Sequence, residues 1–258
     1  MTTHPNCKIN IGLQIVGRRA DGYHELRTIF MPVHSMHDTL TIEPQPDGED
    51  VVMTQQGIAL DNAAADNLCV AAWRLMHSEY GIPPVAITLH KGIPFGAGLG
   101  GGSSDAAFTL KMLNAMFALG LDDATLSRHA AMIGADCPFF IYNRPAYATG
   151  TGDVLEPIGL SLDGYRVEVS IPEGEHVSTR EAYAGVDCIN IDHRPDLRQA
   201  ALLPVESWRG VIENEFERTV LPAHPAIASL KQSFYDRGAV YASMTGSGAA
   251  VFAFFASF

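Results

Sequence analysis

The segment IPFGAGLGGGSSDAA, at residues 93–107, combines a dense run of glycine with two serines and the beginning of an apolar, helix-like sequence. Glycine inside a helix costs about 0.5–1 kcal/mol relative to alanine, so this density needs a reason. Backbone N–H groups that no Cβ atom shields can converge on an anion, and the amino end of a helix favours negative charge. The segment therefore predicts a phosphate-binding loop.

Other interpretations of the loop are weaker. Gly96, Gly98 and Gly101 spell G-x-G-x-x-G, the dinucleotide fingerprint, and Asp122 follows at about the right distance. That fingerprint comes directly after its strand, however, whereas KGIP intervenes here. A Walker A loop is excluded, because no Gly-Lys-Ser/Thr is present. A flexible linker fits poorly, because no polar spacer separates the strand-like and helix-like neighbours.

The two serines after the glycines can serve either the helix or a ligand. Ser103 and Ser104 can cap the helix, contact a phosphate, or contact a phosphate-bound metal ion. Asp105 suits the positive end of the helix, and we interpret it as a capping residue.

Three further segments carry groups that could do chemistry. Lys8 interrupts an apolar strand, where a lysine needs either a partner or a strand edge in water. Asp136, in GADCP, follows a helix end and precedes a proline, so it either presents a carboxylate to a substrate or caps the turn. Tyr23 and His24, in DGYHEL, could stack on and hydrogen-bond a base, although such a pair is usually ordinary surface.

A possible metal cluster is less convincing. His34, His37 and Asp38 form an H-x-x-H-D pattern, but no third distant ligand is in view. We interpret the cluster as a solvated turn.

Composition narrows the classes of function. The chain has 258 residues, of which 47% are hydrophobic and 18% charged, and its net charge of −12 argues against a nucleic-acid partner. No apolar run is long enough for a membrane span, and no secretory signal is visible. The four cysteines are scattered, as expected of reduced thiols in a cytoplasmic protein: Cys7, Cys69, Cys137 and Cys188.

Hydrophobic periodicity predicts the elements that must position these groups. We expect strands at 8–16, 26–34, 38–44, 51–54, 85–90 and 165–172, with strand-like segments at 239–255. We expect helices at 66–81, 105–120, 122–134, 178–184, 197–218 and 224–237, the first capped by Asp66. ADCPFFIY is expected to run into a strand, and a turn-rich passage at 152–165 is expected to separate two lobes, 1–155 and 156–258.

With the motifs in place, the chain resembles the GHMP kinases, a superfamily that includes galactokinase, homoserine kinase and mevalonate kinase. PFGAGLGGGSSDAA resembles their ATP loop, and its triple glycine is typical of members that phosphorylate CDP-methylerythritol. PNCKINIGLQIVGRRADGYHEL resembles the N-terminal strand and substrate loop, although Cys7 stands where alanine is more usual. MTGSGAAVF resembles the third motif, and GADCPFF also matches. The chain stops at Phe258, soon after that motif, where the family usually continues, so the C-terminal lobe is either truncated or short.

The resemblance implies a fold and a reaction. The fold is α+β or α/β with two lobes: an N-terminal lobe like the second domain of ribosomal protein S5, with the ATP loop, and a ferredoxin-like C-terminal lobe. The reaction transfers the γ-phosphate of ATP, with Mg²⁺, to the 2-hydroxyl of CDP-methylerythritol in the non-mevalonate isoprenoid route. We expect a cytoplasmic monomer or weak homodimer with a small-molecule substrate. Alternatives are another GHMP small-alcohol kinase, a nucleotide-binding oxidoreductase, and a binding module that has lost catalysis.

The resemblance also implies roles for single residues. Asp136 is the general base, and Lys8 orients it and neutralises charge. Asn10, on the same side of its strand as Lys8, binds hydroxyls of the acceptor. Tyr23 and His24 read the cytosine. Tyr183 stacks on the face of the base opposite Tyr23, and Asn67 either contacts adenine or caps its helix. Ser104 contacts Mg²⁺. The ATP loop comprises Pro94, Gly96, Ala97, Gly98, Leu99, Gly100, Gly101, Gly102, Ser103 and Ser104.

Overall fold

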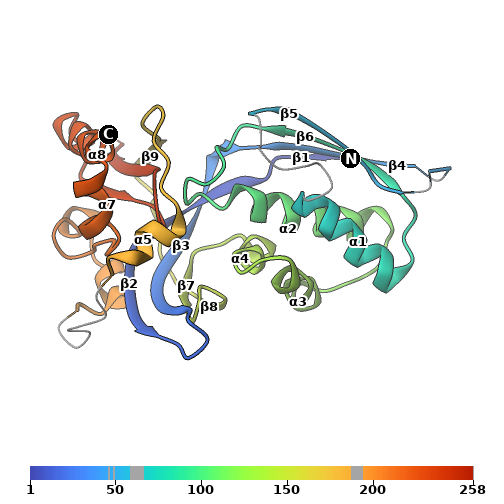
Figure 1. The fold of residues 1–258 in the computed structure, drawn as a ribbon, viewed down its shortest axis with the longest axis horizontal. Helices are drawn as coiled ribbons and strands as arrows, with labels where there is room; N and C mark the ends of the chain where they lie inside the picture. Colours follow the sequence, from blue (N-terminus) through green and yellow to red (C-terminus); the bar gives the residue numbers. More distant parts are fainter. Residues whose placement is uncertain (46, 49, 59–66, 187–193, 258) are drawn as a thin grey trace. The chain divides into compact units, whose positions relative to one another are not determined.

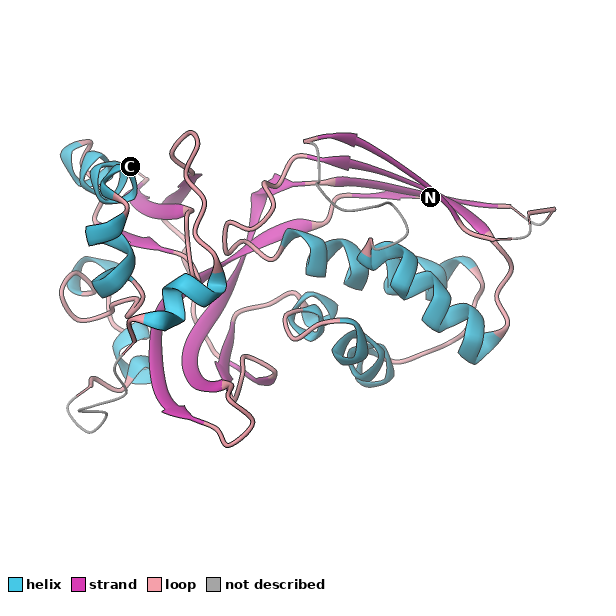
Figure 2. Cartoon of the chain, in the orientation of Figure 1, coloured by secondary structure: helices cyan, strands magenta, loops and turns pink. Residues whose placement is uncertain are grey.

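The computed structural model describes residues 1–45, 47–48, 50–58, 67–186 and 194–257. The contacts of the chain divide it into two compact units, drawn in Figures 1 and 2. The first comprises residues 1–7, 34–95 and 100–143, and the second comprises residues 8–33, 96–99 and 144–258. The expected lobes 1–155 and 156–258 stay a prediction, since these units follow contacts rather than the order of the chain.

The first unit is built on a four-stranded sheet in the order β1-β4-β6-β5. Its strands are β1 (Thr2–Thr3), β4 (Thr39–Pro44), β5 (Val52–Gly57) and β6 (Val85–Lys91). The β4–β6 pairing is antiparallel, and the β5–β6 pairing is parallel. Leu40 lies opposite Leu89 and Ile42 opposite Ile87, and all four side chains are buried. The alternation of β6 also places Lys91 on this buried face.

Four helices complete the first unit: α1 (Leu68–Tyr80), α2 (Gly101–Met116), α3 (Asp123–Ile133) and α4 (Cys137–Tyr142). Helix α2 is central, because it packs against α1, α3, α4 and strand β4 (Figure 1). The strand expected in ADCPFFIY was wrong. Pro138 occupies the first turn of α4, where its missing N–H costs no hydrogen bond, so the proline begins a helix rather than ending regular structure.

The second unit contains two antiparallel sheets. One has the order β2-β3-β7-β8, from β2 (Asn6–Arg18), β3 (His24–His37), β7 (Ala146–Thr149) and β8 (Val154–Pro157). The other has the order β10-β11-β9, from β9 (Tyr165–Ser170), β10 (Tyr241–Met244) and β11 (Val251–Ala256). The first residues of β2 and the last residues of β3 belong to the first unit.

The helices of the second unit are α5 (Thr179–Ala184), α6 (Leu197–Ala201), α7 (Glu217–Ala223) and α8 (Pro225–Asp236), with a 3₁₀ turn at Val205–Ser207. The single helix expected at 197–218 was wrong, since Pro204 and Gly210 interrupt it. Residues 213–215 instead extend beside β2: Leu13 N–H donates to the Glu213 carbonyl, and Glu215 N–H donates to the Leu13 carbonyl.

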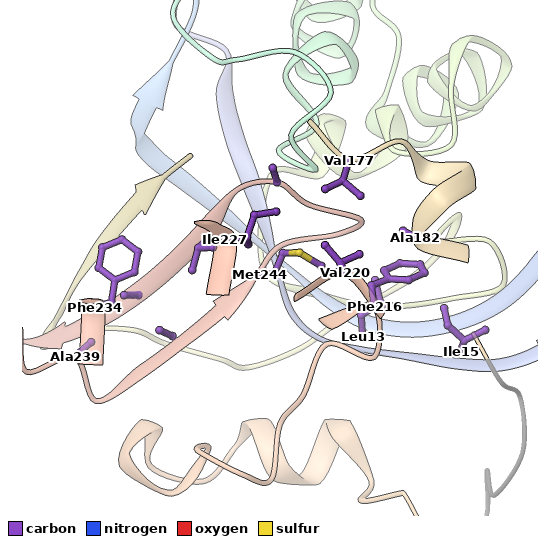
Figure 3. Close-up of a cluster of buried hydrophobic side chains, with 14 of the residues drawn as sticks. Leu13, Ile15, Val177, Ala182, Phe216, Val220, Ile227, Phe234, Ala239 and Met244 are labelled. Atoms are coloured by element: carbon purple, nitrogen blue, oxygen red, sulfur yellow. The ribbon is translucent and has the colours of Figure 1, made fainter. Parts of the chain in front are cut away.

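Figure 3 shows the hydrophobic core of the second unit. Leu13 and Ile15 of β2 contribute to the same cluster as Phe216, Val220, Ile227 and Phe234 from the C-terminal helical region and Met244 from β10. Val177 and Ala182 bring the segment around α5 into this cluster. The core therefore fixes α5 against strands that are distant in sequence. Among the described residues, no helix is long and apolar enough to cross a membrane.

Polar groups are also buried in the first unit, where Lys91 pairs with Asp38 and Asp105. The Lys91 ammonium donates to Asp105 Oδ2 at 2.7 Å and to Asp38 Oδ2. The other oxygen of Asp38 accepts from the N–H groups of Gly92 and Ile93 at 2.6 and 2.8 Å. The interpretations of Asp38 as part of a solvated turn and of Asp105 as a helix cap were both wrong: sequence spacing did not reveal that both carboxylates face one buried lysine.

The two carboxylates are not equivalent. Oδ1 of Asp105 is buried and accepts no hydrogen bond within the described structure, whereas both oxygens of Asp38 are bonded. Burial, together with the negative charge of Asp38, raises the pKa of Asp105 to about 8 despite the opposing effect of Lys91. Burial alone would lower the pKa of Lys91, but the carboxylates of Asp105 and Asp38 raise it overall. Asp105 is therefore the carboxyl that retains a proton more readily, while both oxygens of Asp38 accept hydrogen bonds, one of them from Lys91.

This asymmetry predicts different costs for two matched substitutions. Asp38→Asn removes the carboxylate that pairs with a buried ammonium and accepts two backbone N–H groups, and it should cost about 3–5 kcal/mol of unfolding free energy. Asp105→Asn replaces the carboxyl that retains a proton more readily, and should cost less than about 1 kcal/mol at pH 7. Urea denaturation of both variants measures the difference. Equal losses would contradict the assignment.

The same pair predicts a pH dependence. The pKa of Asp105 is raised on folding, so the folded state binds the extra proton and this group's contribution to stability falls as pH rises from about 4 to about 8. Asp105→Asn should remove that component, which makes its unfolding free energy flatter than the wild type's between pH 5 and pH 8. Identical pH slopes for the two proteins would show that Asp105 does not titrate in this range.

Candidate active site

The glycine segment forms a loop followed directly by the first turn of α2. Gly96, Gly98 and Gly100 have φ of +69°, +77° and +69°, the left-handed region that favours glycine. Helix α2 begins at Gly101, four residues before the expected start at Asp105, with Gly100 at its N-cap and no side-chain cap. The first N–H groups of this helix have no partner inside the helix, which leaves them for an anion.

The first half of the loop is held by backbone contacts within the second unit. A Cβ on Gly98 would lie 2.3 Å from the carbonyl oxygen of Thr245, closer than real Cβ contacts. Gly246 also packs here, since a Cβ on it would lie 3.3 Å from Gly98 Cα. The glycines of the third motif are therefore needed to seat the loop. Substitution at Gly98 would disturb this packing as well as any ligand, so Gly98→Val is a poor probe of nucleotide binding.

Two carbonyls of the loop are also fixed. Lys8 N–H donates to the Leu99 carbonyl at 3.0 Å, and Ala250 N–H donates to the Ala97 carbonyl at 3.3 Å. The side chains of Ala97 and Leu99 are buried, so these two residues contribute backbone to the loop surface. Pro94 precedes the glycines, in the turn after β6.

Ser103 and Ser104 have different surroundings. Ser104 Oγ is fully buried and has no hydrogen-bond partner in the part of the chain that the structure describes. Ser103 hydrogen-bonds the Cys137 thiol, while burial raises the pKa of that thiol to about 11. Neither serine caps α2. The expectation that they cap the helix was wrong, because Gly100 occupies the N-cap.

Lys8 lies in a hydrogen-bonded network inside the second unit. Its ammonium donates to Asn10 Oδ1 at 2.6 Å and lies 4.9 Å from the centroid of the Phe30 ring. Asn10 Nδ2 donates to Thr28 Oγ1 at 3.1 Å, and Asn10 N–H donates to Thr245 Oγ1 at 2.9 Å. Both Lys8 and Asn10 are almost completely buried. The alternation of β2 thus brings the two side chains together, and Asn10 orients the ammonium.

Asp136 occupies the N-cap position of α4 and is half-buried. Its side chain makes no capping hydrogen bond to the helix. Asp136 therefore does not cap α4 through its side chain, and its roles as a base or as a cap of the preceding turn both stay predictions. Lys8 belongs to the second unit and Asp136 to the first, and their pairing stays a prediction.

The aromatic residues expected to bind a base lie within the second unit. The turn before β3 is closed by the Arg19 N–H, which donates to the Tyr23 carbonyl at 2.7 Å, and it leaves the Tyr23 side chain 67% exposed. His24 and Tyr183 stack, with centroids 4.6 Å apart and planes 18° apart. Burial, and secondarily the charge of Arg18, lower the pKa of His24. A neutral His24 ring offers one donor and one acceptor.

Asn67 acts as the N-cap of α1, where its side-chain oxygen accepts from Cys69 N–H at 2.9 Å. The cap was expected at Asp66, which lies outside the described residues. Asn67 Nδ2 also donates to Gln55 Oε1 at 3.4 Å. The capping alternative for Asn67 is therefore confirmed, and the adenine contact stays a prediction.

Sequence reasoning missed three groups of polar residues. Thr245 lies in a motif that drew attention for its glycines rather than for its hydroxyl. Lys91 was one of only four lysines, and its place on the buried face of β6 was the available signal. His224, which contacts two glutamates, carried no local signal.

Metal ligands are sparse. Across the described ranges, no group of three or more His, Cys, Asp or Glu residues could hold a metal ion. The hydroxyl of Ser104, an oxygen donor in the first turn of α2 without a hydrogen-bond partner in the described structure, is compatible with a divalent cation that a nucleotide also binds.

Comparison with known proteins adds independent information. Residues 67–144 match the GHMP kinases N terminal domain, and residues 194–258 match the GHMP kinases C terminal domain. A protein of Bacteroides thetaiotaomicron named 4-diphosphocytidyl-2-C-methyl-D-erythritol kinase is 45% identical over 258 residues, which cover 99% of this chain and 92% of the relative.

Solved structures agree. A crystal structure of 4-(cytidine 5'-diphospho)-2C-methyl-D-erythritol kinase superposes with a TM-score of 0.79 at 34% identity, covering 98% of this chain and 89% of the other. The mevalonate kinase of Methanococcus jannaschii reaches a TM-score of 0.73 at 15% identity, covering 98% and 90%, and shares the fold. The expected two-lobed fold class is thereby confirmed, and the chain belongs to the GHMP kinases.

Proposed function

We propose that this kinase transfers the γ-phosphate of ATP to the 2-hydroxyl of 4-diphosphocytidyl-2-C-methyl-D-erythritol, a step of the non-mevalonate route to isoprenoid precursors. The observation that carries the proposal is 45% identity, over 99% of the chain, to a relative that bears this enzyme's name. The exposed Tyr23 beside the stacked His24 and Tyr183 supports a substrate with a nucleobase. Kinases of simple alcohols have no need of such a feature.

Phosphoryl transfer depends on positioning and on charge neutralisation more than on covalent chemistry. In this proposal the N–H groups of the glycine loop and of the first turn of α2 bind the phosphates of ATP. Asp136 accepts the proton of the attacking hydroxyl, and Lys8, held by Asn10, stabilises negative charge at the acceptor oxygen. Ser104 would hold Mg²⁺ together with the nucleotide, and the ion would neutralise charge on the phosphates.

The cytidine end of the substrate is assigned to the second unit. Tyr23 supplies an exposed aromatic face, and the neutral ring of His24 can donate to and accept from the edge of cytosine. Tyr183 fixes the plane of His24 by stacking.

We propose that the enzyme works in the cytoplasm as a monomer or weak homodimer, and its net charge of −12 disfavours nucleic acid as a partner.

The nucleotide assignment is tested at Gly102, where a side chain meets little protein. A Cβ there has only Leu68 Cδ1 within 4 Å, at 3.7 Å, so Gly102→Val should fold normally. If phosphates lie over the first turn of α2, the new side chain should raise the KM for ATP by about tenfold or more, equivalent to about 1.4 kcal/mol. Gly159→Val is the matched control, because a Cβ at Gly159 has no neighbour within 4 Å. An unchanged KM for ATP in Gly102→Val would remove α2 from the nucleotide site.

The base assignment is tested by Tyr23→Ala. Loss of a stacked aromatic ring costs about 1–3 kcal/mol, so the KM for the CDP-linked alcohol should rise about 5- to 150-fold. The KM for ATP should stay near the wild-type value. Tyr165→Ala, which removes a tyrosine bonded to Glu206, is the control and should leave both constants unchanged. Equal losses for both substrates in Tyr23→Ala would place this ring elsewhere.

The catalytic assignment, and with it the proposed function, is tested by Asp136→Asn in an assay of ADP formation with ATP and the CDP-linked alcohol. Removal of a positioned base should lower kcat by about 10²- to 10⁴-fold while ATP binding survives. Lys8→Met should also lower kcat, and the double variant should lose less than the two effects summed, because both groups serve one step. Near-wild-type kcat in Asp136→Asn would exclude it as the base, and additive losses would separate it from Lys8.

A further inference from the structure

His224, at the junction of α7 and α8, lies between two carboxylates from another part of the second unit. Its Nδ1 is 2.7 Å from Glu175 Oε2, and its Nε2 is 3.0 Å from Glu181 Oε1. The imidazole is 16% exposed, so water only partly screens these contacts. The site outlined above does not use this cluster.

The geometry specifies the charge of the ring. A neutral imidazole has one N–H and one lone pair, so it can donate to only one of two carboxylates. A carboxylate oxygen at each nitrogen favours the form in which both nitrogens carry hydrogen, the imidazolium ion. In agreement, the hydrogen bonds to Glu175 and, secondarily, to Glu181 raise the pKa of His224. Each bond is charge-assisted, and such bonds are stronger than neutral ones.

The two glutamates connect the imidazolium to the elements of the proposed site. Glu181 lies in the first turn of α5, two residues before Tyr183, whose ring stacks on His24. Glu175 lies in the segment between β9 and α5, next to His176, which approaches the glycine loop: a Cβ on Gly96 would lie 3.0 Å from His176 Cε1. His224 thus contacts this part of the chain at two points, Glu175 before α5 and Glu181 within it, and Tyr183 follows in the same helix.

Hydrophobic contacts also hold this segment, since Val177 and Ala182 lie in the core of the second unit (Figure 3) and Tyr183 and Val186 pack against it. Tyr183 packs edge-on against Phe216. Helix α5 has six residues, too short to be stable without tertiary contacts. The contacts of His224 with the two glutamates therefore act beside the hydrophobic core in orienting α5.

We propose that His224 is a positioning residue for substrate recognition: as an imidazolium held by Glu175 and Glu181, it orients α5 so that Tyr183 and His24 present a fixed surface to the nucleobase. The inference rests on the proposed function, since it assumes that the base binds at Tyr23, His24 and Tyr183. His224 itself touches neither substrate, and its effect should fall on the KM for the CDP-linked alcohol rather than on kcat.

The charge of His224 gives the proposal a pH dependence with a definite sign. The charged groups that the structure places against it are Glu175 and Glu181, and His176 acts in turn on Glu181. Because folding raises the pKa of His224, its contribution is complete below pH 6.5 and is lost as pH rises through the folded-state value. Above that value, one ring nitrogen becomes an acceptor that faces a carboxylate.

The experiment compares His224→Gln, which removes the charge, with His224→Lys, which keeps it. At pH 6.5, His224→Gln should raise the KM for the CDP-linked alcohol about three- to tenfold, with kcat and the KM for ATP within about twofold of wild type. His224→Lys should recover part of the loss. The wild-type KM for the alcohol should rise toward alkaline pH, and His224→Gln should flatten this rise. His129→Gln, which removes a histidine bonded to Tyr80 in the first unit, is the matched control.

A second readout needs no substrate. Amide hydrogen exchange in residues 179–184 should be faster in His224→Gln than in wild type, while exchange in β11 should not change. An unchanged KM for the CDP-linked alcohol, in an enzyme that phosphorylates it, would overturn the inference and leave the proposed function intact. Faster exchange in α5 of a protein that phosphorylates a different alcohol would instead overturn the proposed function and keep the ionic anchor.

Discussion

The close approach of two glycine-rich segments is the constraint on which the proposed active site depends. The carbonyl of Thr245 occupies the space that a Cβ at Gly98 would need, although the two residues are 147 positions apart. Thr245 also accepts a hydrogen bond from the backbone of Asn10, whose side chain orients Lys8. The glycine loop, the third motif and strand β2 are therefore fixed together. The glycines are required by this packing, in addition to the role in ligand binding that we propose for them.

The protein is acidic, and two of its four lysines are buried. Lys8 and Lys91 differ in the groups that their ammonium ions contact. Lys91 pairs with Asp38 and with Asp105, the carboxyl that retains a proton more readily, and stabilises the start of α2 against β6. Lys8 instead donates to the amide oxygen of Asn10 and lies over the Phe30 ring within its unit. A buried lysine is thus structural in one unit and, in our account, catalytic in the other.

Sequence reasoning succeeded where a signal is local. The glycine-rich loop before a helix, the strand that carries Lys8 and the helix at Asp123–Ile133 all follow from neighbouring residues, and they were predicted closely. It failed where the outcome depends on distant partners. Asp105 has the sequence position of a helix cap, but in the fold it pairs with Lys91. Residues 213–215, expected to be helical, extend beside β2 instead. The cluster of His224 joins three segments of unremarkable sequence, and only the folded chain reveals it.

The central claim is that a nucleobase-recognising surface has been added to a GHMP kinase, and substrate selection measures it most directly. The purified protein should be assayed for ADP formation with CDP-methylerythritol, mevalonate, homoserine and galactose under identical conditions with ATP and Mg²⁺. Our account predicts that kcat/KM for CDP-methylerythritol is at least about 10³-fold above that for the other three alcohols. Those alcohols have no nucleobase, so they lose several kcal/mol of binding free energy. Comparable turnover of any of the other three alcohols would contradict it.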